Sequence, residues 1–287
     1  MSPRLVALTT ALGAAALLTS AVSAADLKLP RPSQKAQVMQ TIGLTDVTIT
    51  YSRPGVKGRV IWGDLVPYDK VWRTGANEAT SVTFTSDVRI NGQPLRAGTY
   101  SLHTVPTRNE WTVIFNSKAE QWGSYAYDEA SDALRIQVKP QAHEFTEWMH
   151  FSFPEIAVDK ATVALDWEKL RIPFEIQVGT IDLALTNARQ AMSSLAKDDH
   201  QTAFRSAAFA FENNVATDDA RKWIDQSIAI KETWLNLRLK SQMLAKEGKT
   251  EEAIKVAERA IARGKEDGPP EEIAKIEKQV AAWKAKK

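Results

Sequence analysis

Residues 81–105 read SVTFTSDVRINGQPLRAGTYSLHTV, and this stretch decides the fold class. Apolar and polar side chains alternate on both sides of the dipeptide Asn91-Gly92. Alternation with a period of two is typical of a strand with one buried face. Asn-Gly is a strong signal for a two-residue hairpin turn because both residues accept positive φ angles. The stretch therefore predicts two antiparallel strands that meet at Asn91 and Gly92.

The same alternation recurs along the chain as far as residue 178. It is found in the segments DVTITYS (46–52), EWTVIFN (110–116), LRIQV (134–138), FTEWMHFSF (145–153), ATVALDW (161–167) and LRIPFEIQV (170–178). Eight or nine short strands without intervening helices are typical of an antiparallel sandwich. We therefore expect a jelly-roll-like β-sandwich over residues 26–178. Pro173 has no backbone N–H, so we expect an edge or a bulge in the last strand.

From Gly179 onward the chain is Ala-rich, and acidic residues begin several apolar segments, as is typical of helix starts. We expect six helices, at 181–196, 199–213, 218–230, 232–247, 250–265 and 270–285. Ala253 and Ala260 follow Ala220 and Ser227 at an offset of 33 residues. This spacing of small residues resembles the tetratricopeptide pattern, with a generic Ala-rich bundle as the alternative. The fold class is therefore α+β multidomain, with a tetratricopeptide-like helical domain over residues 179–287.

The first 25 residues have the pattern of a secretory signal peptide. Arg4 precedes an apolar run that ends at Leu18, and small residues follow as far as Ala25. We therefore expect a periplasmic or secreted protein. The chain has no Cys, which excludes lipid attachment through a cysteine and disulfide bonds.

Charge and hydropathy exclude two classes of partner. The formal net charge is +2 for the whole chain, so there is no basic excess to displace counterions from nucleic-acid phosphates. No second long apolar run follows the predicted signal peptide. We therefore expect no nucleic-acid partner and no integral membrane segment in the mature chain.

Residues 51–80, YSRPGVKGRVIWGDLVPYDKVWRTGANEAT, concentrate cations, aromatic rings, Gly and Pro in what we call the motif loop. Loops of this composition often carry binding groups, Arg suits carboxylate and phosphate, and aromatic rings offer flat stacking surfaces. We expect a small polar or anionic ligand here. The candidate ligand-binding residues are Arg53, Lys57, Arg59, Trp62, Tyr68, Trp72, Arg73, Asn77 and Glu78, with Trp122 and Tyr125 from a second aromatic segment. In the alternative, Arg73 pairs with Glu78 to brace the loop, and Trp62 and Trp72 fill the core.

The sequence contains no established catalytic signature. There is no Gly-x-Ser-x-Gly, no Gly-rich phosphate loop and no His-Glu-x-x-His. On one continuous strand His143 and His150 would face opposite ways, so we expect no metal site, and we assign no cofactor or catalytic residue. Paired carboxylates for glycoside hydrolysis remain an alternative whose mechanism depends on their separation. The candidates are Asp64, Glu78, Glu110, Asp128 and Asp132.

Several longer motifs resemble a known family. They are QTIGLTDVTITYSRPGVKGRVIWGDLVPYDKVWRTGANEATSVTF (40–84), LRAGTYSLHTVP (95–106), EWTVIFN (110–116) and WGSYAYD (122–128). Together they resemble the bacterial family catalogued as domain of unknown function 2911, over about residues 30–178. The helical tail resembles the tetratricopeptide-like extension of some members. The resemblance implies an exported β-rich domain and no activity, cofactor or site residue.

These observations favour an exported, non-enzymatic module of the cell envelope. Residues 26–178 would bind a ligand, and the helical domain would bind a protein partner. The alternatives are a carboxylate-dependent hydrolase that acts on carbohydrate or cell-wall material, and a purely structural part of an assembly.

Overall fold

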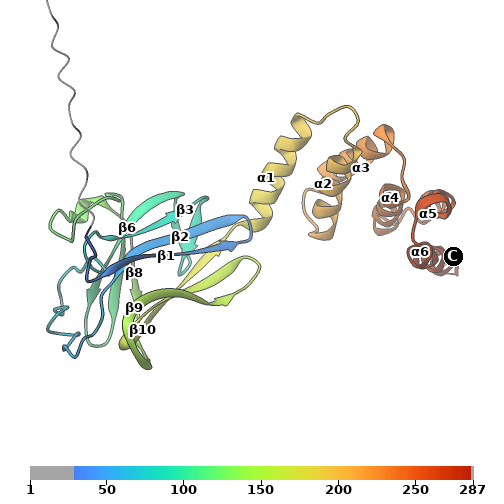
Figure 1. Cartoon of the computed structure of the whole chain (residues 1–287). Helices are drawn as coiled ribbons and strands as arrows, with labels where there is room; N and C mark the ends of the chain where they lie inside the picture. Colours follow the sequence, from blue (N-terminus) through green and yellow to red (C-terminus); the bar gives the residue numbers. More distant parts are fainter. Residues whose placement is uncertain (1–28, 286–287) are drawn as a thin grey trace, which may run out of the picture. The chain divides into compact units, whose positions relative to one another are not determined.

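The computed structural model describes residues 29–285 (Figure 1). The predicted signal peptide, residues 1–25, lies outside the described residues. Residues 33–285 contain all the regular structure described below. Two antiparallel sheets are followed by six helices, which confirms the α+β class.

The first sheet has six strands in the order β1-β2-β3-β6-β7-β8. Every neighbouring pair in it is antiparallel. Its strands are β1 (Gln34–Ile42), β2 (Thr45–Arg53), β3 (Thr80–Phe84), β6 (Gly98–Pro106), β7 (Trp111–Asn116) and β8 (Asp132–Val138). The expected alternation holds in β2, where Val47, Ile49 and Tyr51 are buried. β1 was not predicted from the sequence, because most of its side chains are exposed, as suits an edge strand.

The second sheet has four strands in the order β5-β4-β10-β9. They are β4 (Val88–Ile90), β5 (Gln93–Leu95), β9 (Gln141–Ile156) and β10 (Lys160–Val178). The predicted hairpin joins β4 to β5, with φ of 47° at Asn91 and 81° at Gly92. β10 is a single strand where the sequence predicted two, and it carries register shifts around Glu168, whose φ is 55°. Pro173 lies between the part of β10 that pairs with β9 and the part that pairs with β4, so no paired position needs its missing N–H.

One hydrophobic core contains residues of both sheets and of the motif loop. At its centre Trp62 and Trp72 of the loop pack with Trp111 of β7 and Trp167 of β10. The closest pair is Trp62 and Trp111, whose ring centroids lie 4.9 Å apart in an edge-to-face arrangement. Trp72 also donates from its indole Nε1 to the carbonyl of Gly75. The loop is therefore pinned to the core through two of its aromatic rings.

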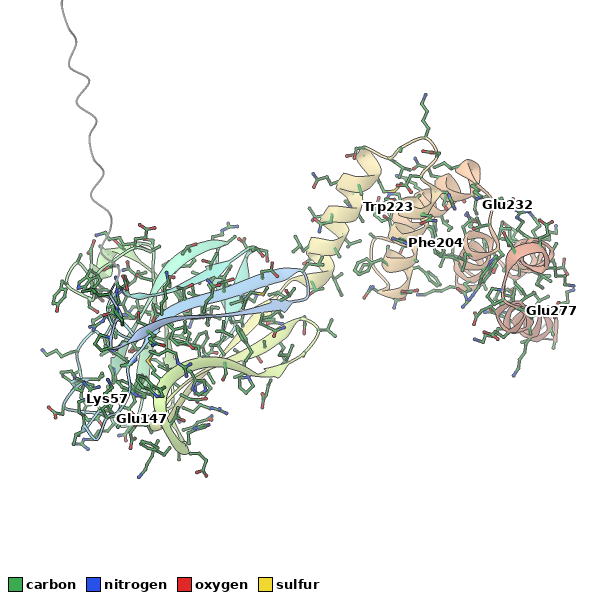
Figure 2. All side chains as sticks on the ribbon, in the orientation of Figure 1. Lys57, Glu147, Phe204, Trp223, Glu232 and Glu277 are labelled. Atoms are coloured by element: carbon green, nitrogen blue, oxygen red, sulfur yellow. The ribbon has the colours of Figure 1, made fainter. Side chains whose placement is uncertain are left out.

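The six expected helices are confirmed with small differences at their ends. They are α1 (Thr180–Ser193), α2 (His200–Glu212), α3 (Thr217–Ile230), α4 (Trp234–Lys246), α5 (Thr250–Asp267) and α6 (Pro270–Ala285). Two apolar clusters hold them, and Phe204 of α2 and Trp223 of α3 belong to the first (Figure 2). Among the described residues, no helix is both long and apolar enough to cross a bilayer.

Candidate functional site

A row of polar side chains crosses the outer face of the six-stranded sheet, the face turned away from the core. Residues paired directly across antiparallel strands point to the same side of a sheet. The registers of five successive strand pairs therefore align six side chains, namely Gln37, Thr50, Ser81, Ser101, Asn116 and Asp132. The first two are bonded, because Gln37 Nε2 donates to Thr50 Oγ1 at 2.9 Å. The outer face thus offers a band of hydroxyl, amide and carboxylate groups.

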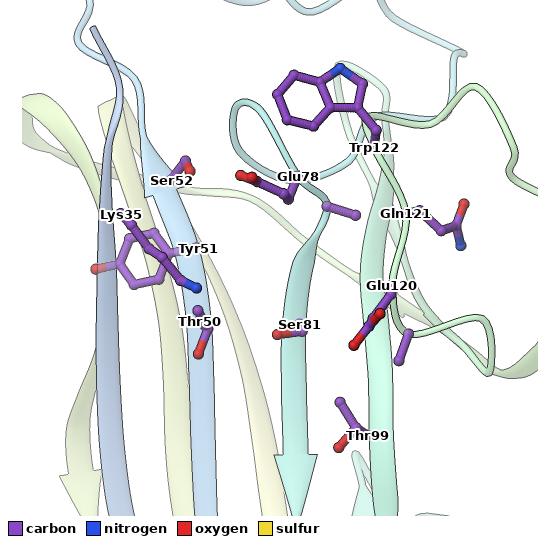
Figure 3. Close-up of a pocket in the computed structure, with 12 residues that line it drawn as sticks. Lys35, Thr50, Tyr51, Ser52, Glu78, Ser81, Thr99, Glu120, Gln121 and Trp122 are labelled. Atoms are coloured by element: carbon purple, nitrogen blue, oxygen red, sulfur yellow. The ribbon is translucent and has the colours of Figure 1, made fainter. Parts of the chain in front are cut away.

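A cavity of about 630 Å³ lies over part of this row (Figure 3). Its floor has four hydroxyl side chains, Thr50, Ser52, Ser81 and Thr99, from strands β2, β3 and β6. Lys35 of β1 reaches the cavity from one side, while Glu78, Glu120 and Trp122 line the opposite side (Figure 3). The floor is therefore set by strand register and the far wall by two loops.

Backbone hydrogen bonds hold the far wall in place. The segment 119–122 runs antiparallel to the end of the motif loop, with a bridge between Glu78 and Trp122. Ala79 N donates to the carbonyl of Gln121 at 2.9 Å, and Gly123 N donates to the carbonyl of Asn77 at 3.1 Å. This pairing brings the Glu78 carboxylate and the indole of Trp122 to one cavity.

The arrangement can bind a polar molecule through complementary hydrogen bonds. Hydroxyl groups donate and accept, the ammonium of Lys35 donates, and ionised carboxylates accept. Trp122 keeps 58% of its surface exposed, so its ring offers a flat apolar face at the cavity rim. Among the described residues, no group of three His, Cys, Asp or Glu side chains is placed to hold a metal ion.

The model of the family described as "Protein of unknown function (DUF2911)" matches residues 33–176, half of the chain. This protein belongs to the DUF2911 family. The predicted resemblance is thereby confirmed for the β-rich part, and every residue that lines the cavity falls within the matched range. No curated protein and no solved structure matches the chain. Residues 33–176 are called the DUF2911 domain below.

Three cations of the motif loop make contacts outside the cavity of the DUF2911 domain. Arg53 Nε donates to the carbonyl of Met149 at 3.0 Å. The guanidinium of Arg59 donates to the carbonyls of Gly55 and Val56 within its own loop. The backbone N–H of Lys57 donates to the Glu147 carboxylate, and the two residues lie side by side in Figure 2. These bonds brace the loop against itself and against β9.

The remaining candidate residues are distributed over several surroundings. Trp62 and Trp72 pack in the core, which is the alternative considered for them. Tyr68 lies under the guanidinium of Arg108, 5.2 Å from its ring centroid, and Tyr125 is 88% exposed. Asn77 Nδ2 donates to the carbonyl of Ser33 at 3.0 Å. Of the eleven candidates, Glu78 and Trp122 line the cavity.

Arg73 of the DUF2911 domain is partly buried near Tyr125. Burial lowers the pKa of its guanidinium, and the interaction with Tyr125 opposes that shift. Its Nε is buried and has no hydrogen-bond partner among the described residues. The residue before Arg73, Trp72, forms an isolated bridge with Thr104 of β6.

Sequence reasoning missed most of the cavity. Lys35, Thr50, Ser52, Ser81, Thr99 and Glu120 were not named as site residues. The available signal was the outward-facing register of the alternating segments, in which Thr48, Thr50 and Ser52 share one face. The order of strands β2, β3 and β6 then gathers these hydroxyls, and a local pattern does not reveal that order.

A second polar cluster on β9 and β10 corrects one expectation. His143 and His150 were expected to face opposite ways, but both direct Nε2 toward Oδ2 of Asp166, at 3.9 Å and 3.5 Å. The expectation was wrong because β9 is irregular here, with register shifts against β10 on both sides of Glu168. Asp166 is buried and receives two hydrogen bonds from Arg171, at 2.7 Å and 2.8 Å.

Proposed function

We propose that the DUF2911 domain binds a small neutral polyhydroxylated molecule, of the size of a mono- or disaccharide, in the cavity on the outer face of its six-stranded sheet. One observation carries the proposal: four floor hydroxyls and the exposed ring of Trp122 line the same cavity. Sugar hydroxyls both donate and accept, as Ser and Thr hydroxyls do, and an indole face packs against the apolar face of a sugar ring. The volume of about 630 Å³ lies within the usual range for small-molecule pockets.

The charged groups favour a neutral ligand over an anion. Lys35 supplies the cavity with a cation, while Glu78 and Glu120 supply carboxylates that repel phosphate and carboxylate groups. The guanidinium groups of Arg53 and Arg59, which suggested an anionic ligand in the sequence, donate to backbone carbonyls. We therefore place the ligand over the sheet and not among the arginines of the motif loop.

A thermal-shift screen of the purified protein tests the proposal. The panel contains neutral sugars and polyols, sugar acids, sugar phosphates and peptidoglycan fragments. A ligand that binds only the native state raises Tm by mass action. A shift confined to neutral polyols and sugars supports the proposal. A shift confined to the anions, or no shift with any compound, contradicts it.

A carboxylate-dependent hydrolase is the second candidate, because Glu78 and Glu120 both line the cavity. Glycoside hydrolases use two carboxyl groups that flank the scissile bond. If the protein is such an enzyme, it releases reducing ends from an oligosaccharide or a cell-wall glycan, and Glu78→Gln and Glu120→Gln each abolish release. If the protein is a binding module, ligand binding occurs without any product.

We also propose that the two sheets form a jelly-roll-like sandwich and that the helices form tetratricopeptide-like hairpins. The shared core supports the first point. The second is supported by the burial of Ala220, Ser227, Ala253 and Ala260, each at most 1% exposed at the proposed repeat positions. In this proposal the helical domain docks a protein partner. A crystal structure of the protein tests both arrangements.

Export to the periplasm or medium is proposed from the pattern of residues 1–25. The sharpest test is the N-terminal sequence of the protein recovered from the cell envelope or medium of its host. A start at about residue 25 or 26 supports cleavage at the small residues that end the pattern. Recovery of the whole chain with its initial residues intact contradicts it.

A further inference from the structure

His103 connects the sheet to the wall of the cavity. It lies on β6, is fully buried, and points to the outer face like Ser101 two residues before it. Its Nε2 is 3.2 Å from Ser101 Oγ, and its Nδ1 is 3.3 Å from Ser124 Oγ. Ser124 is two residues after Trp122 of the wall segment. The imidazole therefore bridges a strand and the loop that covers it.

The bonds of Ser101 decide which ring nitrogen of His103 carries the proton. A hydroxyl has one proton and two acceptor sites. Ser101 Oγ donates its proton to the carbonyl of Lys118 at 2.8 Å and accepts from Gln121 Nε2 at 3.1 Å. It can therefore only accept from His103, which places a proton on Nε2. Nδ1 is then the free acceptor and takes the hydroxyl proton of Ser124.

We propose that His103 is the positioning residue of the cavity, and that its bonds to Ser101 and Ser124 hold the 118–124 segment where Gln121 and Trp122 form the wall. The ligand part of this inference rests on the proposed function, and the loop part does not. Both ring nitrogens of His103 are used. The bond of Nε2 to Ser101 orients Gln121, which also bonds Ser101, and the bond of Nδ1 holds Ser124, two residues after Trp122. The segment is also held by its backbone pairing to Asn77 and Ala79 and by bonds of Lys118 and Gln121 to Asn116. The bonds of His103 add the contact at Ser124, at the far end of the segment.

The surroundings of His103 keep the imidazole uncharged. Burial lowers the pKa of His103 to about 4, although the negative charge of Asp132 opposes the shift. The titratable and charged groups around it are Tyr127, whose ring packs against the imidazole, and Asp132 and Arg135 of β8. From the motif loop, Arg73 follows Trp72, which pairs with Thr104 next to His103. The Asp132 carboxylate is already engaged by Tyr127 and Arg135. A second proton on the ring would occupy Nδ1, and the Ser124 hydroxyl would then accept from the ring where it had donated. The protonated ring would also carry a buried charge that water solvates better, so acid should favour opening of the wall.

Hydrogen exchange of the purified protein tests the loop part without any ligand. His103→Leu removes both bonds, while His103→Gln keeps a donor that reaches Ser101. We expect exchange of the amides of Ala79 and Gly123 to accelerate about tenfold or more in His103→Leu, the cost of about one hydrogen bond, and less in His103→Gln. Peptides of β9 should be unchanged, and His200→Gln in the helical domain is the matched control. Equal protection of the wall amides in wild type and His103→Leu overturns the inference.

A gentler variant covers the case in which His103→Leu does not fold. Ser124→Ala deletes only the hydroxyl that Nδ1 accepts, and it too should speed exchange of the Gly123 amide. In wild type the protection factors of the wall should fall as the pH approaches 4, while those of His103→Gln should show no such step. A wild-type profile that matches His103→Gln at every pH overturns the inference.

The ligand arm separates this inference from the proposed function. With a sugar that shifts the wild-type Tm, affinity should fall about tenfold in His103→Leu and recover in part in His103→Gln. Unchanged affinity in His103→Leu overturns the positioning role while the proposed function stands. If no sugar binds wild type, the proposed function fails, and the exchange experiment still decides the role of His103.

Discussion

Ser81 of β3 pairs directly with Ser101 of β6. This pair connects the floor of the cavity to the residue that holds the wall segment in place. The Ser81 hydroxyl lines the cavity. The Ser101 hydroxyl is fully buried beneath the loop, where it meets Gln121, the carbonyl of Lys118 and the ring of His103. Ser81 therefore contacts the ligand site, while its neighbour Ser101 attaches the loop. A mutation at one position can test one role without removing the other.

The pH dependence of stability should show the burial of His103. Its pKa is about 4 in the folded chain, below the ordinary value of 6.5. Between pH 6.5 and pH 4 the unfolded chain binds a proton at this histidine that the folded chain does not. The free energy of unfolding is therefore not reduced by this histidine above pH 6.5, and it decreases as the pH falls toward 4. The expected loss is about 3 kcal/mol.

Urea unfolding of wild type and His103→Gln at pH 7.5 and pH 4.5 measures this loss. The carboxylates are the same in both proteins, so the difference between the two pH responses isolates the histidine. Wild type should lose more stability on acidification than the variant. Parallel losses in the two proteins would show that His103 is protonated normally in the folded chain.

The Trp cluster should dominate the stability of the DUF2911 domain. Trp111 is fully buried and packs edge-to-face with Trp62. Trp111→Ala should therefore cost about 3–5 kcal/mol of unfolding free energy, through lost transfer energy and an unfilled cavity. Trp122→Ala, at an exposed position, should change it by no more than about 0.5 kcal/mol. Denaturant unfolding of both variants checks the contrast, and similar costs would contradict the assignment of Trp111 to the core and Trp122 to the rim.

Removal of the buried carboxylate on β10 should destabilise the second sheet. Asp166→Ala leaves the Arg171 guanidinium without its two hydrogen-bond acceptors, at an expected cost of about 3–5 kcal/mol. Replacing both residues by Leu should cost less than the single change, because no unpaired charge then remains. A double-mutant cycle in urea measures the coupling. A double variant that loses the sum of the two single costs would show that the ion pair is not coupled.

Local patterns predicted the elements of this chain better than its site. The Asn91-Gly92 turn and the helix starts depend on residues close in sequence, and both are confirmed. The edge strand β1 does alternate, and Ala36, Val38 and Ile42 face the core. This face is only half-buried along most of its length, and the exposed Met39 interrupts the apolar pattern. Likewise, the register shifts of β10 against β9 occur around Glu168, a single residue with positive φ. The alternation of apolar and polar residues does not reveal such a residue.

The cavity depends on relationships that no local pattern contains. Glu78 and Trp122 meet through a bridge between two loops distant in sequence, and Thr50 reaches Ser81 through strand pairing. The aromatic rings of the motif loop illustrate the opposite case. Trp62 and Trp72 lie in a segment whose composition is typical of a binding loop. They pack in the core because Trp111 and Trp167, on strands distant in sequence, contact them there.

The most direct measurement of the central claim is the binding of a neutral sugar to three proteins by calorimetry or thermal shift. These are wild type, Trp122→Ala, and Trp148→Ala as the matched control, since Trp148 is a partly exposed ring on β9 that does not line the cavity. We expect wild type and Trp148→Ala to bind alike, and Trp122→Ala to lose about tenfold or more in affinity, which is the worth of one aromatic contact. Equal binding by Trp122→Ala, or loss in Trp148→Ala instead, would contradict a ligand site in the cavity.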